Sequence, residues 1–117
     1  MGGGLPPKRR RMPVGMGQVR AGPDECDLTF TVDLIGVRRE ATREVEVGDT
    51  LDVGLVGPHG SRAAVCLTPD GTIVGALAAF RGLVSLLECL DRGVRFDAAV
   101  DDVGATRCTV TVTRAEP

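Results

Sequence analysis

The side chains that could act as a nucleophile and its base are few in this sequence of 117 residues. His59 is the single histidine, and Ser61 lies two residues after it in a glycine-containing loop. A serine becomes a nucleophile when a base is held against it and a third group orients that base. The sequence around His59 offers no such third group. The neighbouring carboxylates Asp101 and Asp102 could in principle bind a cation, but such a pair is typical of a turn. We therefore expect a protein that is not an enzyme and needs no cofactor.

The four cysteines, at positions 26, 66, 89 and 108, are the next candidates for chemistry. None of them has the short spacing of zinc ligands, and no histidine is close enough in the sequence to complete a site. Cys108 alternates with valines, as a small buried hydrophobic residue would. The basic N-terminus has no apolar stretch after it and does not resemble a secretory signal. We expect reduced, buried thiols in a cytoplasmic protein, with no metal.

Basic side chains gather in the first 25 residues. Lys8, Arg9, Arg10 and Arg11 form a run among glycines and prolines, without hydrophobic periodicity. Residues 1–25 contain five basic and two acidic residues, a net charge of +3, whereas residues 26–117 have a net charge of −5. Such a segment buries too little apolar surface to offset the entropy of ordering it. We expect a disordered arm over 1–25 and a single domain over 26–117.

Three interpretations of this basic run stay open. It could bind phosphates, because clusters of Lys and Arg neutralise nucleic-acid backbones. It could be solvated and have no partner. Met12 and Met16 are also possible start positions, in which case residues 1–15 would not be translated.

The remaining chain alternates apolar and polar side chains, the pattern of strands with one buried face. The clearest stretch runs from Cys26 to Gly36. Shorter ones lie around Val45 and Val47, over 51–55, over 94–100 and over 108–112. Residues 101–104 are expected to form the turn between the last two strands.

The centre of the chain predicts a hairpin followed by a helix. Pro69-Asp70-Gly71 separates two apolar stretches and has the residues of a tight turn. Over about 78–92, apolar residues recur every three or four positions and would form one buried stripe of a helix. They are Phe80, Leu83, Val84, Leu87 and Leu90. Gly93 is expected to end this helix.

Together these elements indicate a mainly β protein with one helix. About six to seven short strands, each with one apolar face, are expected to form a small closed or partly open β-barrel. The amphipathic helix would pack against this barrel. Aromatic residues make up 3% of the chain, so Val, Leu and Ala must supply most of the core. No apolar run approaches the roughly 20 residues of a membrane helix, so no membrane is expected.

Between residues 48 and 100 the order of features resembles the HIRAN domain, a small β-barrel with a helical insertion found fused to DNA-remodelling ATPases. The residues that carry the resemblance are Gly48-Asp49-Thr50-Leu51, Pro58-His59, Ala63-Ala64-Val65-Cys66-Leu67, Asp70 to Leu77, and Leu90 to Val100 with Gly93. In that family the loop and its adjoining strands recognise DNA, notably single-stranded 3′ ends. The resemblance implies a DNA-binding module, with Arg62 and His59 in the loop and Arg38, Arg39 and Arg81 around it.

The acidic charge of residues 26–117 opposes a general attraction to phosphate, so DNA contacts would depend on these local arginines and on the arm. The three phenylalanines fall on apolar faces and are not placed to stack on bases. The alternative is a protein-interaction or regulatory barrel that offers an edge strand or a groove to a partner.

Overall fold

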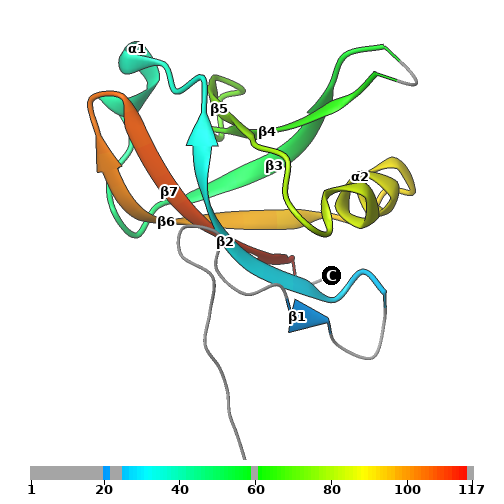
Figure 1. Cartoon of the computed structure of the whole chain (residues 1–117). Helices are drawn as coiled ribbons and strands as arrows, with labels where there is room; N and C mark the ends of the chain where they lie inside the picture. The colour runs from blue at the N-terminus through cyan, green and yellow to red at the C-terminus, as the bar shows by residue number, and fades with distance from the viewer. Residues whose placement is uncertain (1–19, 22–24, 59–60, 116–117) are drawn as a thin grey trace, which may run out of the picture.

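A computed structural model describes residues 20–21, 25–58 and 61–115 of the chain. Its strands are β1 (Arg20–Ala21), β2 (Leu28–Ile35), β3 (Thr50–Val56), β4 (Ala63–Leu67), β5 (Ile73–Leu77), β6 (Phe96–Gly104) and β7 (Arg107–Arg114). They follow the order β1-β2-β5-β4-β3-β6-β7, and β2 also pairs with β7. Strands β2 to β7 therefore form a closed six-stranded antiparallel barrel (Figure 1). The predicted mainly β barrel is confirmed.

The barrel closes at β2. This strand pairs with β7 over Thr29–Asp33 but with β5 through only two positions, Leu34 opposite Leu77 and Ile35 opposite Ala76. Gly75 makes this close approach possible. A Cβ on Gly75 would lie 3.0 Å from the carbonyl oxygen of Ile35, a distance at which the backbone of β2 would have to move.

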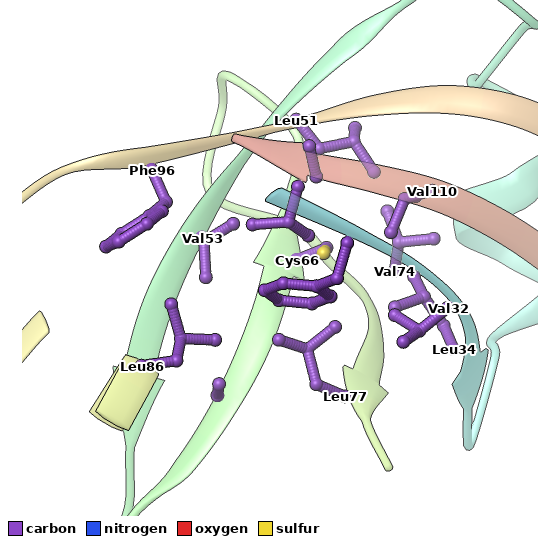
Figure 2. Packing of buried hydrophobic residues seen from close by; sticks show 14 of the residues in the cluster. Val32, Leu34, Leu51, Val53, Cys66, Val74, Leu77, Leu86, Phe96 and Val110 are labelled. Atoms are coloured by element: carbon purple, nitrogen blue, oxygen red, sulfur yellow. The ribbon is translucent and has the colours of Figure 1, made fainter. Parts of the chain in front are cut away.

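Every second side chain of β2 and β7 is buried, as the alternation in the sequence predicts. The buried set is Leu28, Phe30, Val32 and Leu34 on β2, with Cys108, Val110 and Val112 on β7. Figure 2 shows Val32, Leu34 and Val110 meeting inside the barrel. Burial of these side chains inside the barrel thus stabilises the arrangement of β2 and β7 in the ring.

The predicted hairpin is confirmed as β4 and β5. Gly71 has a φ of 94°, which glycine adopts without a steric penalty. Within the turn, the Thr72 N–H donates to Oδ1 of Asp70 at 3.2 Å. The Thr68 hydroxyl, which also donates to this carboxylate, and to a smaller extent the Thr72 bond lower the pKa of Asp70, because both stabilise the ionised carboxylate.

Helix α2 (Leu83–Asp91) begins later than the predicted helix over 78–92. Gly82 precedes it with a φ of 100°, so the chain cannot be helical through this point. Phe80 lies before the helix, with its ring centroid 4.4 Å from that of Phe30. No helix in the described part of the chain is long and apolar enough to cross a membrane.

The buried face of α2 also differs from the predicted stripe. Val84, expected to be buried, is 69% exposed, whereas Leu86 is fully buried. Figure 2 shows Leu86 pointing from α2 toward Val53 of β3. The break at Gly82 separates Phe80 from the helix, and packing against the barrel, which the spacing of apolar residues does not contain, determines which side of α2 is buried. Leu83, Leu87 and Leu90 pack at the edge of the core and are partly buried.

The segment around Val45 and Val47 is not a strand, contrary to the sequence pattern. A short helix, α1 (Arg39–Thr42), and turns occupy this stretch, and Val47 is 63% exposed. The neighbouring β3 already pairs with both β4 and β6, and β2 with β5 and β7. The first half of β3, which follows this segment, therefore already has a strand on each side.

Residues 101–104 continue β6 instead of forming the predicted turn. Val103 pairs with Cys108 and Gly104 with Arg107, so the turn is the dipeptide Ala105-Thr106. A register shift between Val100 and Asp102 marks a β-bulge. One extra residue at the bulge interrupts the alternation without ending the pairing.

Strand β1 belongs to the stretch predicted as a disordered arm. Arg20 pairs with Thr29 and Ala21 with Leu28, so these two residues join the sheet. Residues 1–19 lie outside the described residues, and for them the predicted arm stays a prediction.

Leu86→Ala should lower the free energy of unfolding by about 2–5 kcal/mol, the usual cost of truncating a fully buried leucine. Val84→Ala, on the exposed face of the same helix, should change it by less than about 0.5 kcal/mol. Urea unfolding of both variants measures the difference. Equal effects at the two positions would contradict the described orientation of α2.

Candidate functional site

The arginines predicted to bind DNA lie apart from one another. Arg62 immediately precedes β4 and forms an ion pair with Asp91, the last residue of α2. Arg81 precedes the other end of this helix, which spans about 14 Å at 1.5 Å per residue. Arg38 and Arg39 are at the start of α1, on a different side of the barrel from α2 (Figure 1). These four side chains therefore do not form one patch.

Two further parts of the prediction cannot be placed. His59 in the loop, and Lys8, Arg9, Arg10 and Arg11 in the arm, lie outside the described residues. Their role in nucleic-acid binding stays a prediction.

A different set of arginines does come together. Arg92, Arg95 and Arg114 line one pocket of about 620 Å³, together with Asp27 and residues 93, 94 and 115. We call it the arginine pocket. It lies where α2 ends, β6 begins and β7 ends, near the start of β2 (Figure 1).

The end of α2 determines how the chain enters this pocket. Gly93 has a φ of 92° and donates its N–H to the Leu90 carbonyl at 3.0 Å. The Val94 N–H donates to the Cys89 carbonyl at 3.0 Å. These two bonds are those of a Schellman motif, which ends a helix and reverses the chain. The predicted role of Gly93 as a helix end is confirmed.

The β6–β7 hairpin brings the third arginine to the same place. Phe96, the first residue of β6, pairs with Arg114, the last residue of β7. Beyond this pair, the Ala115 N–H donates to the Arg95 carbonyl at 2.9 Å. The backbones around Arg95 and Arg114 are therefore held side by side although 18 residues separate them in the sequence.

The ion pairs of the pocket leave it positively charged. Arg114 donates to Asp27 at 3.0 Å, and Nη1 of Arg92 lies 3.0 Å from the carboxylate of Glu25. Arg95 is exposed and has no ion pair with another described residue. Among the described residues, the three guanidinium groups of the pocket thus compare with two carboxylates, Asp27 in the lining and Glu25 beside it. The ion pairs orient Arg92 and Arg114, and Arg95, with five N–H donors on its guanidinium, can offer a ligand anion a bidentate contact beside them.

The sequence does not indicate these residues as a group, because their proximity depends on strand register. The turn after β6 was expected at residues 101–104, and with that turn Arg114 would not lie opposite Phe96. A two-residue turn at Ala105-Thr106 alone would place Arg114 opposite Asp97, and the β-bulge between Val100 and Asp102 shifts the pairing by one residue to Phe96. No local motif marks Arg92, Arg95 or Arg114.

The expected reduced thiols are wrong for two of the four cysteines. Cys26, just before β2, forms a disulfide with Cys89 of α2, with 5.9 Å between their Cα atoms. A bond between residues 63 positions apart has no signature in the spacing of cysteines along a chain. Cys66 and Cys108 are free and buried, and the expected burial is confirmed for all four.

The free thiols are poor nucleophiles. Burial, with a smaller effect of the adjacent Cys108, raises the pKa of Cys66 to about 12. Burial also raises the pKa of Cys108, and the charge of Asp102 adds to this shift. Within the described residues, no three His, Cys, Asp or Glu side chains are grouped so as to hold a metal ion.

Comparison with known proteins adds no relative: no family model, curated protein or solved structure matches this chain.

Cys66 should resist alkylation in the folded protein. With a pKa of about 12, about one thiol in 10⁴ is ionised at pH 8, and the thiolate is the reactive form. Iodoacetamide treatment followed by peptide mass spectrometry should show labelling at Cys66 at least a hundredfold slower than in urea, a ratio that follows from burial and ionisation together. Similar rates in the two conditions would contradict a buried, protonated thiol.

Proposed function

We propose that this chain is a non-enzymatic module that binds single-stranded nucleic acid, DNA in the first instance, with the arginine pocket as its phosphate-binding site. The observation that carries the proposal is the convergence of Arg92, Arg95 and Arg114 in an otherwise acidic domain. The HIRAN-like order of features supports it as well, because the chain is a small β-barrel with a packed helix. Membership of that family is part of the proposal.

The position of β1 favours a polymeric ligand over a single nucleotide. Arg20 pairs with Thr29, two residues after the pocket residue Asp27. The basic run at residues 8–11 is connected to this point by 9 to 12 residues, a reach of at most roughly 30–40 Å. A strand with several phosphates can therefore contact the pocket and the basic run together, which adds avidity.

The aromatic residues suggest that phosphates, and not bases, are the main contacts. Phe30 and Phe96 are buried in the core, and the ring of Phe80 packs against Phe30. Sequence-tolerant binders of single strands usually stack bases on exposed aromatic rings. Without such rings in the described domain, we expect weak sequence preference and strong dependence on salt.

Arg95→Ala should weaken binding of fluorescein-labelled oligo(dT), measured by anisotropy at low salt. It should also reduce the slope of log K against log[salt] by about 0.7, the value for one lost phosphate contact on a single strand. Arg62→Ala is the matched control, because Arg62 is bound to Asp91 outside the pocket. An effect of Arg62→Ala as large as that of Arg95→Ala would favour the loop over the arginine pocket.

Deleting residues 1–19 separates the two contributions. The shortened protein keeps β1 and the pocket, so it should still bind oligo(dT) at low salt, with lower affinity and a shallower salt slope. If it shows no binding while the full chain binds, the arm alone is responsible. If neither binds, the nucleic-acid proposal fails.

A protein-interaction function is the second candidate, and one observation favours it. Strand β3 pairs with β4 over Asp52–Val56 but with β6 only over Thr50–Asp52. Its second half therefore has one edge without a strand partner in the described part of the chain. A groove of about 310 Å³ beside this edge is lined by Leu55, Leu90, Val94 and Phe96 among others. An extended peptide bound there would depend on apolar contacts and backbone hydrogen bonds, so its affinity should change little with salt.

A further inference from the structure

The disulfide between Cys26 and Cys89 lies against the arginine pocket. It connects the residue before the pocket's Asp27 to the last turn of α2. Both cysteines are 2% exposed. A charged group in direct contact with these sulfur atoms therefore acts on them at a distance that water does not enter.

Arg92 is that charged group. Its Nη2 lies 2.9 Å from Sγ of Cys26 and 3.7 Å from Sγ of Cys89. Its Nη1 is 3.0 Å from the carboxylate of Glu25. A disulfide sulfur is a neutral, weak acceptor and gains little from a guanidinium. A thiolate in the same place gains a charge-assisted hydrogen bond, which is how neighbouring arginines activate cysteines.

We propose that Cys26 and Cys89 form a reversible redox pair, and that Arg92 stabilises its reduced form as a Cys26 thiolate. Arg92 thus stabilises the Cys26 thiolate, which exists only after the disulfide has been reduced. In this respect the bond differs from a purely structural disulfide, whose reduction produces thiols with no neighbouring cation to stabilise a thiolate.

The reduction requires a dithiol as electron donor. One thiolate of the dithiol attacks Sγ of Cys89 and forms a mixed disulfide, while the bond to Cys26 breaks and its electron pair stays on Cys26 beside Arg92. The second thiol of the dithiol then attacks the reductant's sulfur in the mixed disulfide. Cys89 is released and takes up a proton, and the dithiol leaves as its own disulfide, having supplied two electrons. Because both sulfurs are buried, the first attack follows a local opening of the last turn of α2.

Reduction changes the arginine pocket in two ways. It adds a negative charge next to Arg92, so the net positive charge of the pocket falls. It also breaks the covalent link between the end of α2 and the segment before β2. Arg92 and Arg95 directly follow this end of α2. Anion binding should therefore be stronger in the oxidised protein than in the reduced one.

The test is the equilibrium between protein and mixtures of reduced and oxidised dithiothreitol, read by alkylation of Cys26 and Cys89 and mass spectrometry of the intact chain. Arg92→Gln should lower the equilibrium constant for reduction by about tenfold, the effect of one pKa unit at the Cys26 thiol. Arg92→Lys should restore part of it. Glu25→Gln should raise the constant, because it removes the carboxylate that competes for Arg92. Arg107→Gln is the control: Arg107 is an exposed, ion-paired arginine bound to Asp102, and its removal should leave the constant within twofold.

Opposite shifts for Arg92→Gln and Glu25→Gln support the proposal, since simple loss of structure would move both variants in the same direction. An unchanged constant in Arg92→Gln, shifts of the same sign, or no disulfide after air oxidation would overturn it. Oligo(dT) affinity of the oxidised and reduced proteins tests the link to the pocket. If the redox shifts occur but no oligo(dT) binds in either state, the proposed function fails and the redox pair stands.

Discussion

The pairing of β2 with strands on both of its edges is the constraint on which the rest of the structure depends. Along one edge it holds β7, and along the other it holds β1 and then, through two residue pairs, β5. Closure of the barrel therefore rests on a short contact that needs Gly75 and the buried face of β2 together. Glu25, Cys26 and Asp27 lie just before β2 in the chain. The strand that closes the barrel thus places the carboxylates and the sulfur beside the arginine pocket.

Strands and turns with a local cause could be predicted from the sequence. The alternation in β2 and β7 follows from one buried face, and the hairpin at Pro69-Asp70-Gly71 follows from the dihedral preferences of its turn. The predictions failed where a single residue changed the phase of a pattern. Gly82 delays the start of α2, and the bulge after Val100 interrupts the alternation inside β6, which continues to Gly104. Both are decided by packing and pairing with distant parts of the chain, which a local pattern does not contain.

The candidate site shows the same limit more strongly. Arg62, which the sequence places near a loop, has its charge compensated by a carboxylate from another element. Arg92, Arg95 and Arg114 come together only because a helix end and a strand end are brought together by register. The disulfide is comparable, since it connects the segment before β2 to α2 across 63 positions. The charge of the sequence limits the class of ligand that the chain can bind. Ion pairing in the folded chain then determines which arginines can contact that ligand.

The most direct test of the proposed site is to locate the ligand on the protein. Amide chemical shifts of ¹⁵N-labelled chain lacking residues 1–19 would be followed during titration with oligo(dT) at low salt. If the arginine pocket binds the strand, the largest changes are expected at residues 92–95 and 114–115, at both sides of the pocket. Largest changes around Arg62, or at Arg38 and Arg39, or no changes at any ligand concentration, would contradict binding at this pocket.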